Sequence, residues 1–238
     1  MTAAAETLLF APRPQPSVAV AGTTARFPVG RIFCVGRNYA DHAKEMGAEV
    51  DREAPFYFIK DTGSLTASGA TVPYPQGTKD FHHEMEFVVA IGAAAFEIPV
   101  ERALDVVFGY AAGLDMTRRD LQAAAKAKGK PWDFAKNFER AAVIAPIVEK
   151  AAFGAVGHQH IGLAVGGTAR QSSHLDEMVW SVPELIAHLS RFYRLAPGDL
   201  IYTGTPAGVG PVVPGDHIRG EIDGLPPVEL TIAPAETV

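Results

Sequence analysis

Turn-forming residues interrupt this sequence so often that few long helices can form. The 238 residues include 23 glycines and 18 prolines, and the β-rich runs between them are short, as in 31–36 (RIFCVG), 56–60 (FYFIK) and 200–202 (LIY). This pattern predicts many short strands joined by turns and argues against a helical bundle. No linker or internal repeat divides the chain. We therefore expect an extended lead-in over residues 1–30 and a single domain over 31–238, mostly β with a few helices.

Periodicity and turn signals place the other elements. Further strands are predicted over 83–91, 106–116, 161–165 and 168–171, with two closing strands within 216–232. Helices are predicted over 38–46, 117–128 and 183–193. The dipeptide Gly166-Gly167 is typical of a two-residue hairpin turn. The last helix places Leu189 and Phe192 on one apolar face, and 61–80 and 203–215 are predicted as loops.

Composition excludes several classes of protein. An apolar share of 47% with 20% charged residues can bury a sizeable core, so the chain is not disordered as a whole. The net charge of −6 leaves no electrostatic footprint for nucleic acid or an anionic membrane. Cys34 is the single cysteine, which excludes an internal disulfide and predicts a small buried hydrophobe. With no basic leader and no apolar span, we expect a cytoplasmic protein.

Three carboxylates form the most informative pattern. Glu84 and Glu86 lie two apart on a predicted strand, so their side chains point to the same face, which enters an apolar run. Asp115 ends another uncharged strand. Three such carboxylates would suit Mg²⁺ or Mn²⁺. The alternatives are a solvated strand edge for the glutamates and a helix cap for Asp115. Zinc would want imidazole, but we expect His82 and His83 only to flank the site.

Other polar side chains could complete an active site. His42 and Glu45 lie three apart on a predicted helix, where a carboxylate could stabilise an imidazole acting as a base; an ordinary surface pair is the alternative. Arg119 and Gln122 also share a helix face and could hold a carboxylate or an oxyanion, or could simply be solvated. Lys136, among aromatic residues, could be a second cation for an anionic substrate or a surface lysine.

These pieces occur in the order found in a known family. The motifs that carry the resemblance are VGRNYADHAKEMG (35–47), FIK (58–60), HHEMEFVVAIG (82–92), GYAAGLDMTRRDLQ (109–122), GKPWDFAKNF (129–138) and TGTPAGVGPVVPGD (203–216). Together they resemble the fumarylacetoacetate hydrolase family over nearly the whole chain. The resemblance implies a mixed β-sandwich roll and a single catalytic domain, assembled as a homodimer. It also implies one divalent ion per chain, Mg²⁺ or Mn²⁺.

The resemblance also assigns roles to residues of this sequence. It implies Glu84, Glu86 and Asp115 as metal ligands, and His42 and Glu45 as the dyad that activates water. By the same resemblance, the oxyanion and substrate-binding pair is Arg119 and Gln122, the active-site lysine is Lys136, and the substrate-pocket loop contains Thr205. Lys60 matches a lysine that stands before a proline in relatives, whereas in this chain the next residue is Asp61.

The segments LDMTRRDLQ and GKPWDFAKNF are most similar to fumarylpyruvate hydrolases of the gentisate pathway and to acylpyruvases. The implied activity is magnesium-dependent hydrolysis of the C–C bond of an acylpyruvate, such as fumarylpyruvate, in aromatic catabolism. The partner would be a small anionic keto acid, without nucleic acid or membrane. Two alternatives stay open: a metal-dependent oxaloacetate decarboxylase, and a non-catalytic metal-binding homologue, against which the His42–Glu45 pair argues.

Overall fold

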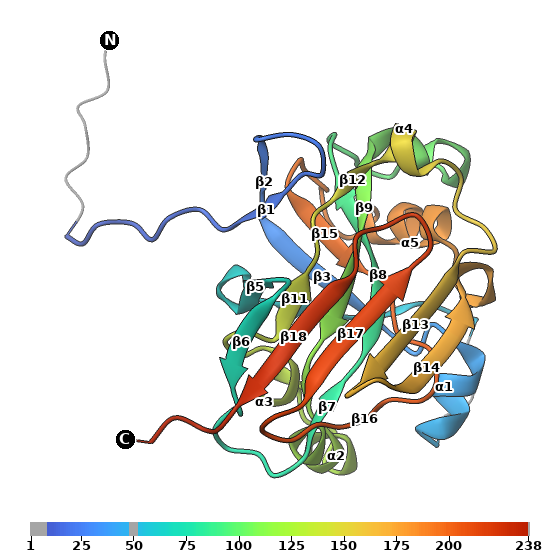
Figure 1. Cartoon of the computed structure of the whole chain (residues 1–238). Helices are drawn as coiled ribbons and strands as arrows, with labels where there is room; N and C mark the ends of the chain where they lie inside the picture. The colour runs from blue at the N-terminus through green and yellow to red at the C-terminus, as the bar shows by residue number, and fades with distance from the viewer. Residues whose placement is uncertain (1–8, 48–51, 238) are drawn as a thin grey trace.

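The computed structural model describes residues 9–47 and 52–237. Two β-sheets pack face to face, with the helices around them (Figure 1). The larger sheet runs in the order β4 (Phe56–Lys60), β3 (Arg31–Gly36), β15 (Asp199–Tyr202), β8 (Met85–Ile91), β9 (Val107–Asp115), β11 (Ala142–Ile144) and β5 (Leu65–Ala67), with β12 (Val148–Glu149) beside β9. The five-stranded sheet runs in the order β14 (Thr168–His174), β13 (His160–Val165), β17 (His217–Ile222), β18 (Val228–Ala233) and β6 (Ala70–Pro73).

Shorter elements close the ends of this sandwich. A three-stranded ribbon contains β10 (Thr117–Arg118), β7 (Phe81–His83) and β16 (Gly210–Pro211). The α-helices are α1 (Ala40–Glu45), α2 (Arg119–Ala127), α3 (Asp133–Lys136), α4 (Lys150–Phe153) and α5 (Val182–Leu189). 3₁₀ helices lie at Thr62–Ser64, Val100–Val106 and Leu175–Glu177. The mostly β fold with a few helices is confirmed.

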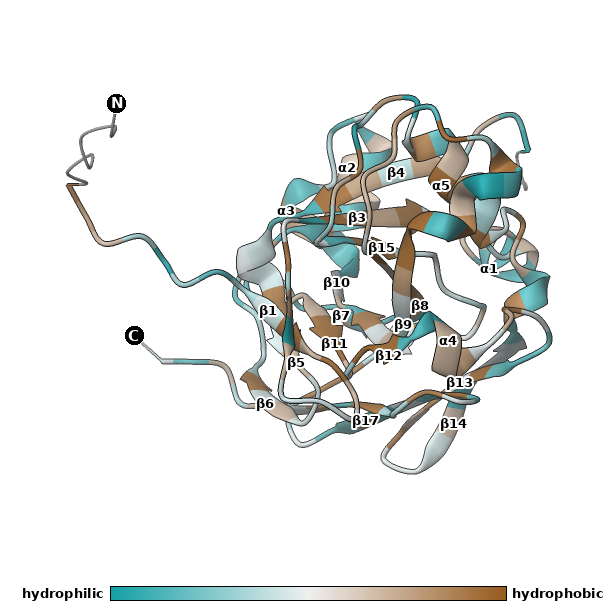
Figure 2. Cartoon of the chain, turned by 90° about the horizontal axis from the view of Figure 1, so that it is seen from above, coloured by the Kyte–Doolittle hydropathy of each residue, from teal (hydrophilic) through white to brown (hydrophobic). Residues whose placement is uncertain are grey.

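The larger sheet is buried on both faces, which explains why β8 is apolar almost throughout. Alternate residues of β8 serve different cores. Phe87 and Val89 pack between the two sheets, whereas Val88 and Ala90 join a second cluster on the opposite face. Cys34 belongs to that second cluster and is fully buried, as expected. Figure 2 shows hydrophobic colour concentrated along these central strands.

Several predicted elements differ in detail. Within the range predicted as an extended lead-in, β1 (Ser17–Ala19) and β2 (Arg26–Pro28) form a hairpin that buries Val18 and Phe27 in the second cluster. The loop predicted over 61–80 contains β5 and β6, which are short enough to escape a periodicity argument. The predicted helix over 183–193 ends at Leu189, so Phe192 is exposed and not part of its buried face.

The predicted Gly166-Gly167 hairpin is confirmed, and the structure adds a helix cap that was not predicted. The hairpin at Gly166-Gly167 joins β13 to β14, and both glycines have the positive φ that such a turn requires. Helix α5 begins with a capping box in which the Ser181 and Glu184 side chains satisfy each other's backbone amides. No helix in the described part of the chain is long and apolar enough to cross a membrane.

Gly113 holds three strands of the larger sheet at close approach. A Cβ added there would lie 2.6 Å from Val88 Cγ2, 2.8 Å from Tyr202 Cε1 and 3.1 Å from the Val143 carbonyl oxygen. Because a ring and a backbone atom cannot easily move away, we expect Gly113→Ala to lower the free energy of unfolding by about 1–3 kcal/mol, measured by denaturant titration.

The matched control is Gly157→Ala, where the nearest atom to an added Cβ, Gln159 Oε1, is 4.0 Å away. This variant should unfold close to the wild-type midpoint. If the two alanine variants unfold at the same midpoint, the added methyl group at Gly113 costs no stability and the prediction is wrong.

Candidate active site

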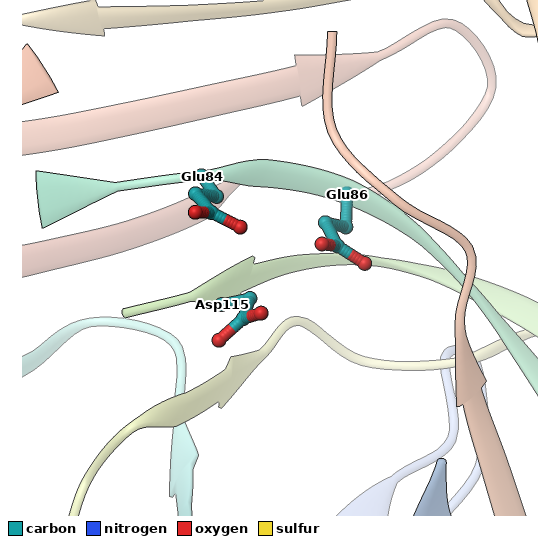
Figure 3. A group of neighbouring side chains, drawn as sticks. All are labelled: Glu84, Glu86 and Asp115. Carbon is teal, nitrogen blue, oxygen red and sulfur yellow. The ribbon is translucent and has the colours of Figure 1, made fainter. Parts of the chain in front are cut away.

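Strand register brings the three predicted carboxylates together. In the antiparallel pair of β8 and β9, Glu86 lies opposite Gly113 and Met85 opposite Leu114. The Asp115 amide then donates to the Glu84 carbonyl at 2.9 Å. One carboxylate oxygen from each of Glu84, Glu86 and Asp115 lies within 4.8 Å of the others, and all three residues are buried (Figure 3).

The strand is not continuous through this group. Glu84 occupies a break between β7 and β8, where the chain passes from the three-stranded ribbon into the larger sheet. Glu86 and Asp115 lie on the same face as the second apolar cluster, so the site is the polar end of that face. The three carboxylates therefore converge as predicted. However, Glu84 lies between the ribbon and the larger sheet, and not on one regular strand with Glu86.

The three carboxylates differ in electrostatic environment. Burial raises the pKa of Glu86 well above its usual range, and the charges of Asp115 and Glu84 raise it further. Burial would also raise the pKa of Glu84, but Lys136 and Arg119 hold it well below its usual range. Among described residues Glu86 has no cationic partner; its Oε2 accepts a hydrogen bond from the Gly204 amide at 2.8 Å.

Two buried lysines contact the carboxylates. Lys136 Nζ donates to Glu84 Oε2 at 2.8 Å, to Asp115 Oδ2 at 2.7 Å and to Thr117 Oγ1 at 2.7 Å. Burial lowers the pKa of Lys136, but Asp115 and Glu84 more than compensate and raise it overall. Lys60 Nζ lies 2.8 Å from Asp115 Oδ1, although no aligned hydrogen bond reaches that oxygen. The charge of each lysine therefore partly neutralises the carboxylate cluster.

Helix α2 presents Arg119 and Gln122 to the same cluster. Arg119 donates to Glu84 Oε1 at 2.5 Å and to Gln122 Oε1 at 2.5 Å, so the predicted pair forms. Because the Gln122 oxygen accepts from Arg119, its amide nitrogen is left free to donate to a ligand.

The predicted His42–Glu45 pair is also formed. Its His42 Nδ1 and Glu45 Oε2 are 3.2 Å apart, and the Gly208 amide donates to both Glu45 oxygens, at 3.1 and 3.2 Å. Helix α1 is therefore tied to the 203–210 loop. His42 is 6% exposed, which excludes the surface-pair alternative.

One pocket is lined by seven of the ten predicted site residues. They are His42, Glu84, Glu86, Arg119, Gln122, Lys136 and Thr205. Thr205 Oγ1 accepts from Gln171 Nε2 at 2.8 Å, which leaves its hydroxyl proton free. Asp115 and Lys60 lie behind this wall, in contact with its lysine and glutamate. A pocket that combines three carboxylates, a histidine–glutamate pair and free hydrogen-bond donors can bind a cation and a small anion together.

Sequence reasoning missed several supporting residues. Gln171 receives the Met85 amide at 3.0 Å and approaches His83 Nδ1 at 3.1 Å, so it fixes the strand break at Glu84. Asn38 is fully buried and donates to the Thr203 carbonyl at 2.8 Å, which links α1 to the same loop. Neither amide residue stands in a pattern of charge or spacing that would single it out. Their signal is burial, which only the structure gives.

The histidines outside the dyad stay apart from the carboxylates. His83 is buried, and burial lowers its pKa to about 4. His82 lies next to Asp80 and Arg119. The exposed His158 pairs with Asp176. In the described ranges, Glu84, Glu86 and Asp115 are the one group of three or more acids, histidines or cysteines close enough to hold a metal ion.

A family model decides where this chain belongs. The model described as fumarylacetoacetate (FAA) hydrolase, C-terminal, matches residues 31–233. The chain belongs to the fumarylacetoacetate hydrolase family. The expected resemblance and its fold are thereby confirmed, and the range matched covers every site residue described above.

Relatives within the family are named for activities on fumarylpyruvate or on oxaloacetate. A fumarylpyruvate hydrolase of Ralstonia sp is 50% identical over 194 residues, covering 80% of this chain and 100% of that protein. A mitochondrial oxaloacetate tautomerase of Arabidopsis thaliana is 42% identical over 202 residues, covering 85% of this chain and 90% of the relative. A mitochondrial oxaloacetate decarboxylase of Dictyostelium discoideum is 41% identical over 196 residues, covering 82% and 89%.

Among solved structures, the fumarylpyruvate hydrolase of Pseudomonas aeruginosa, in complex with Mn²⁺ and pyruvate, superimposes with a TM-score of 0.93. It is 45% identical, and the match covers 96% of this chain and all of that one. The backbone similarity therefore extends over both sheets and the pocket.

Proposed function

We propose that this protein hydrolyses the C–C bond of an acylpyruvate, with fumarylpyruvate, cleaved to fumarate and pyruvate, as its preferred substrate. The observation that carries the proposal is the meeting of a buried carboxylate triad, a histidine–glutamate dyad and the free donors of Gln122 and Thr205 around one pocket. The similarity to fumarylpyruvate hydrolases supports the choice of substrate.

Glu84, Glu86 and Asp115 would hold a divalent cation, Mg²⁺ or Mn²⁺. Their donors are all carboxylate oxygens, which these ions prefer, and Asp115 Oδ1 has no aligned donor of its own. The uncompensated charge around Glu86 is the kind that a cation stabilises. When bound, such an ion supplies Lewis-acid stabilisation of the negative charge on a departing pyruvate enolate. Manganese in the Pseudomonas structure supports a divalent ion, and magnesium is our choice for this chain.

The dyad would generate the nucleophile. Glu45 holds Nδ1 of His42, which leaves Nε2 to accept a proton from water. The water oxygen then bonds to the acyl carbonyl carbon, and the C–C bond to the pyruvoyl methylene breaks. Its electron pair passes to the pyruvate enolate, and the proton on His42 returns to that enolate carbon. One water is consumed, and one carboxylic acid and one pyruvate are formed.

Two hydrogen-bond donors that line the pocket would hold the charges that develop. The Gln122 amide and the Thr205 hydroxyl each retain a free donor for an oxyanion. Lys136 has its three N–H groups on Glu84, Asp115 and Thr117, and Lys60 contacts Asp115. We therefore propose that these lysines position the carboxylates, and a direct catalytic step for Lys136 stays a prediction.

A second candidate is conversion of oxaloacetate, by tautomerisation or decarboxylation, because relatives at 42% and 41% identity carry those names. Decarboxylation requires neither an attacking water nor a general base, so the dyad favours hydrolysis over decarboxylation. We also propose that the protein is a homodimer, that it is located in the cytoplasm and that it acts in gentisate breakdown.

A panel assay tests the proposal. The protein would be incubated with Mg²⁺ and fumarylpyruvate, maleylpyruvate, acetylpyruvate or oxaloacetate, and the products would be separated and identified. We expect fumarylpyruvate to be cleaved faster than the other three compounds, with fumarate and pyruvate formed in equal amounts. Turnover of oxaloacetate alone would replace the hydrolase assignment with the second candidate.

A further inference from the structure

The pocket has an inner and an outer end with different chemistry. The inner end holds the buried carboxylates with Arg119 and Gln122. The outer end is lined by two exposed cationic residues, Arg37 and Lys126, which also line the adjoining surface groove. Neither cation makes an ion pair within the ranges that the structure describes. A substrate anchored at the inner end would therefore extend toward unpaired positive charge.

Arg37 is held at this mouth by an unusual backbone. Its φ is +59°, in the left-handed region that favours glycine. Its neighbour Asn38 fixes this conformation from a fully buried position, donating to the carbonyls of Thr203 at 2.8 Å and Trp180 at 3.0 Å. The guanidinium has one aromatic neighbour, the Phe56 ring, at 6.0 Å from its centroid. An arginine at such a position costs conformational energy, which is typical of a residue retained for a ligand.

Lys126 continues the ligand-facing row of helix α2. Arg119, Gln122 and Lys126 are spaced three and four residues apart, so they share one helix face. With a rise of about 1.5 Å per residue, Lys126 lies about 10 Å along the axis from Arg119. Within the described ranges its ammonium has one hydrogen-bond partner, the Met46 carbonyl oxygen at 3.4 Å. The row thus leads from the buried site to the outer cations.

An aromatic wall lies between the two ends. Phe58 and Trp132 line both the pocket and the groove, with ring centroids 6.0 Å apart. Phe56 extends this wall, 5.0 Å from Trp132. Flat apolar faces suit a planar, unsaturated carbon chain better than a hydrated polar one.

We propose that Arg37 and Lys126 form a subsite for a second carboxylate, at the far end of the acyl chain, and so select dicarboxylic acylpyruvates over monocarboxylic ones. The guanidinium fork of Arg37 would bind that carboxylate through two N–H groups, and Lys126 would add a point charge. The planar acyl chain would lie along Phe58 and Trp132. This inference rests on the proposed function for its inner anchor and adds a specificity that the triad and dyad cannot supply.

The kinetic test compares fumarylpyruvate with acetylpyruvate, which ends in a methyl group. We expect Arg37→Gln to lower kcat/KM for fumarylpyruvate about 10- to 100-fold, mainly through KM, and Lys126→Gln to lower it less. Acetylpyruvate should be affected about twofold or less by either change. Matched controls are Arg191→Gln and Lys128→Gln, exposed cations that do not line the pocket. Equal losses on both substrates would overturn the subsite.

A binding test separates this inference from the proposed function because it needs no turnover. Calorimetry on the magnesium-loaded protein would compare α-ketoadipate with α-ketohexanoate, which differ only in a terminal carboxylate or methyl group. The wild type should prefer the diacid, and Arg37→Gln should abolish that preference without changing affinity for the monoacid. Equal wild-type affinities would overturn the subsite. A preference without any acylpyruvate hydrolysis would overturn the proposed function and leave the subsite standing.

Discussion

Glu86→Gln is expected to reduce fumarylpyruvate hydrolysis below about 1% of the wild-type rate, because removing even the outer partners of metal ligands typically costs ~10–100-fold. Magnesium and manganese affinity, measured by calorimetry, should fall in parallel. The free energy of unfolding in EDTA should stay unchanged or rise. The variant loses like-charge repulsion with Glu84 and Asp115, and a glutamine oxygen can still accept the Gly204 amide.

Asp115→Asn makes an instructive contrast. Asp115 contacts Lys60 and Lys136, so its loss leaves the buried Lys60 without a carboxylate partner and Lys136 with Glu84 alone. The variant should lose about 3–5 kcal/mol of stability as well as metal affinity. Glu101→Gln, at an exposed glutamate outside the pocket, is the matched control and should bind metal normally. Undiminished metal binding by Glu86→Gln, or full activity of EDTA-treated protein, would contradict the metal site.

The second large effect is expected for His42→Ala. Loss of a general base typically costs ~10²–10⁴-fold in rate, so acylpyruvate hydrolysis should fall by that factor. Any decarboxylation of oxaloacetate should fall far less, since it needs no attacking water. The measurement is kcat for both reactions in the same magnesium-loaded preparation, with circular dichroism to show that the variant is folded.

His158→Ala is the matched control, because His158 is exposed and pairs with Asp176 away from the pocket. It should retain both activities. If His42→Ala lost the two activities equally, the dyad would serve metal binding or folding and not the activation of water.

Much of the fold was predictable because it depends on local signals. Short β-rich runs between turn formers predicted β3 and β4 with their observed boundaries, and the Gly166-Gly167 turn predicted its hairpin. Side-chain alternation paired Glu84 with Glu86, and the place of Asp115 at the end of an uncharged strand added the third carboxylate. His42 and Glu45 followed equally from helical spacing.

What the sequence could not show depends on contacts between distant segments. The break at Glu84 exists because Gln171, 86 positions away from Met85, takes up the Met85 amide. Lys60 reaches Asp115 from the edge strand of the sheet, and nothing in its local pattern distinguishes it from a surface lysine. Arg37 is exposed and charged, so only its φ and its place at the pocket mouth set it apart.

Hydrolysis of fumarylpyruvate in water enriched in heavy oxygen tests the central claim most directly. If water attacks the acyl carbonyl within this pocket, each fumarate released by the magnesium-loaded protein carries one heavy oxygen in the newly formed carboxylate. The label should disappear with the activity in Glu86→Gln and His42→Ala. Fumarate without the label, or substrate consumed without fumarate and pyruvate appearing together, would contradict the proposal that this protein is a C–C bond hydrolase.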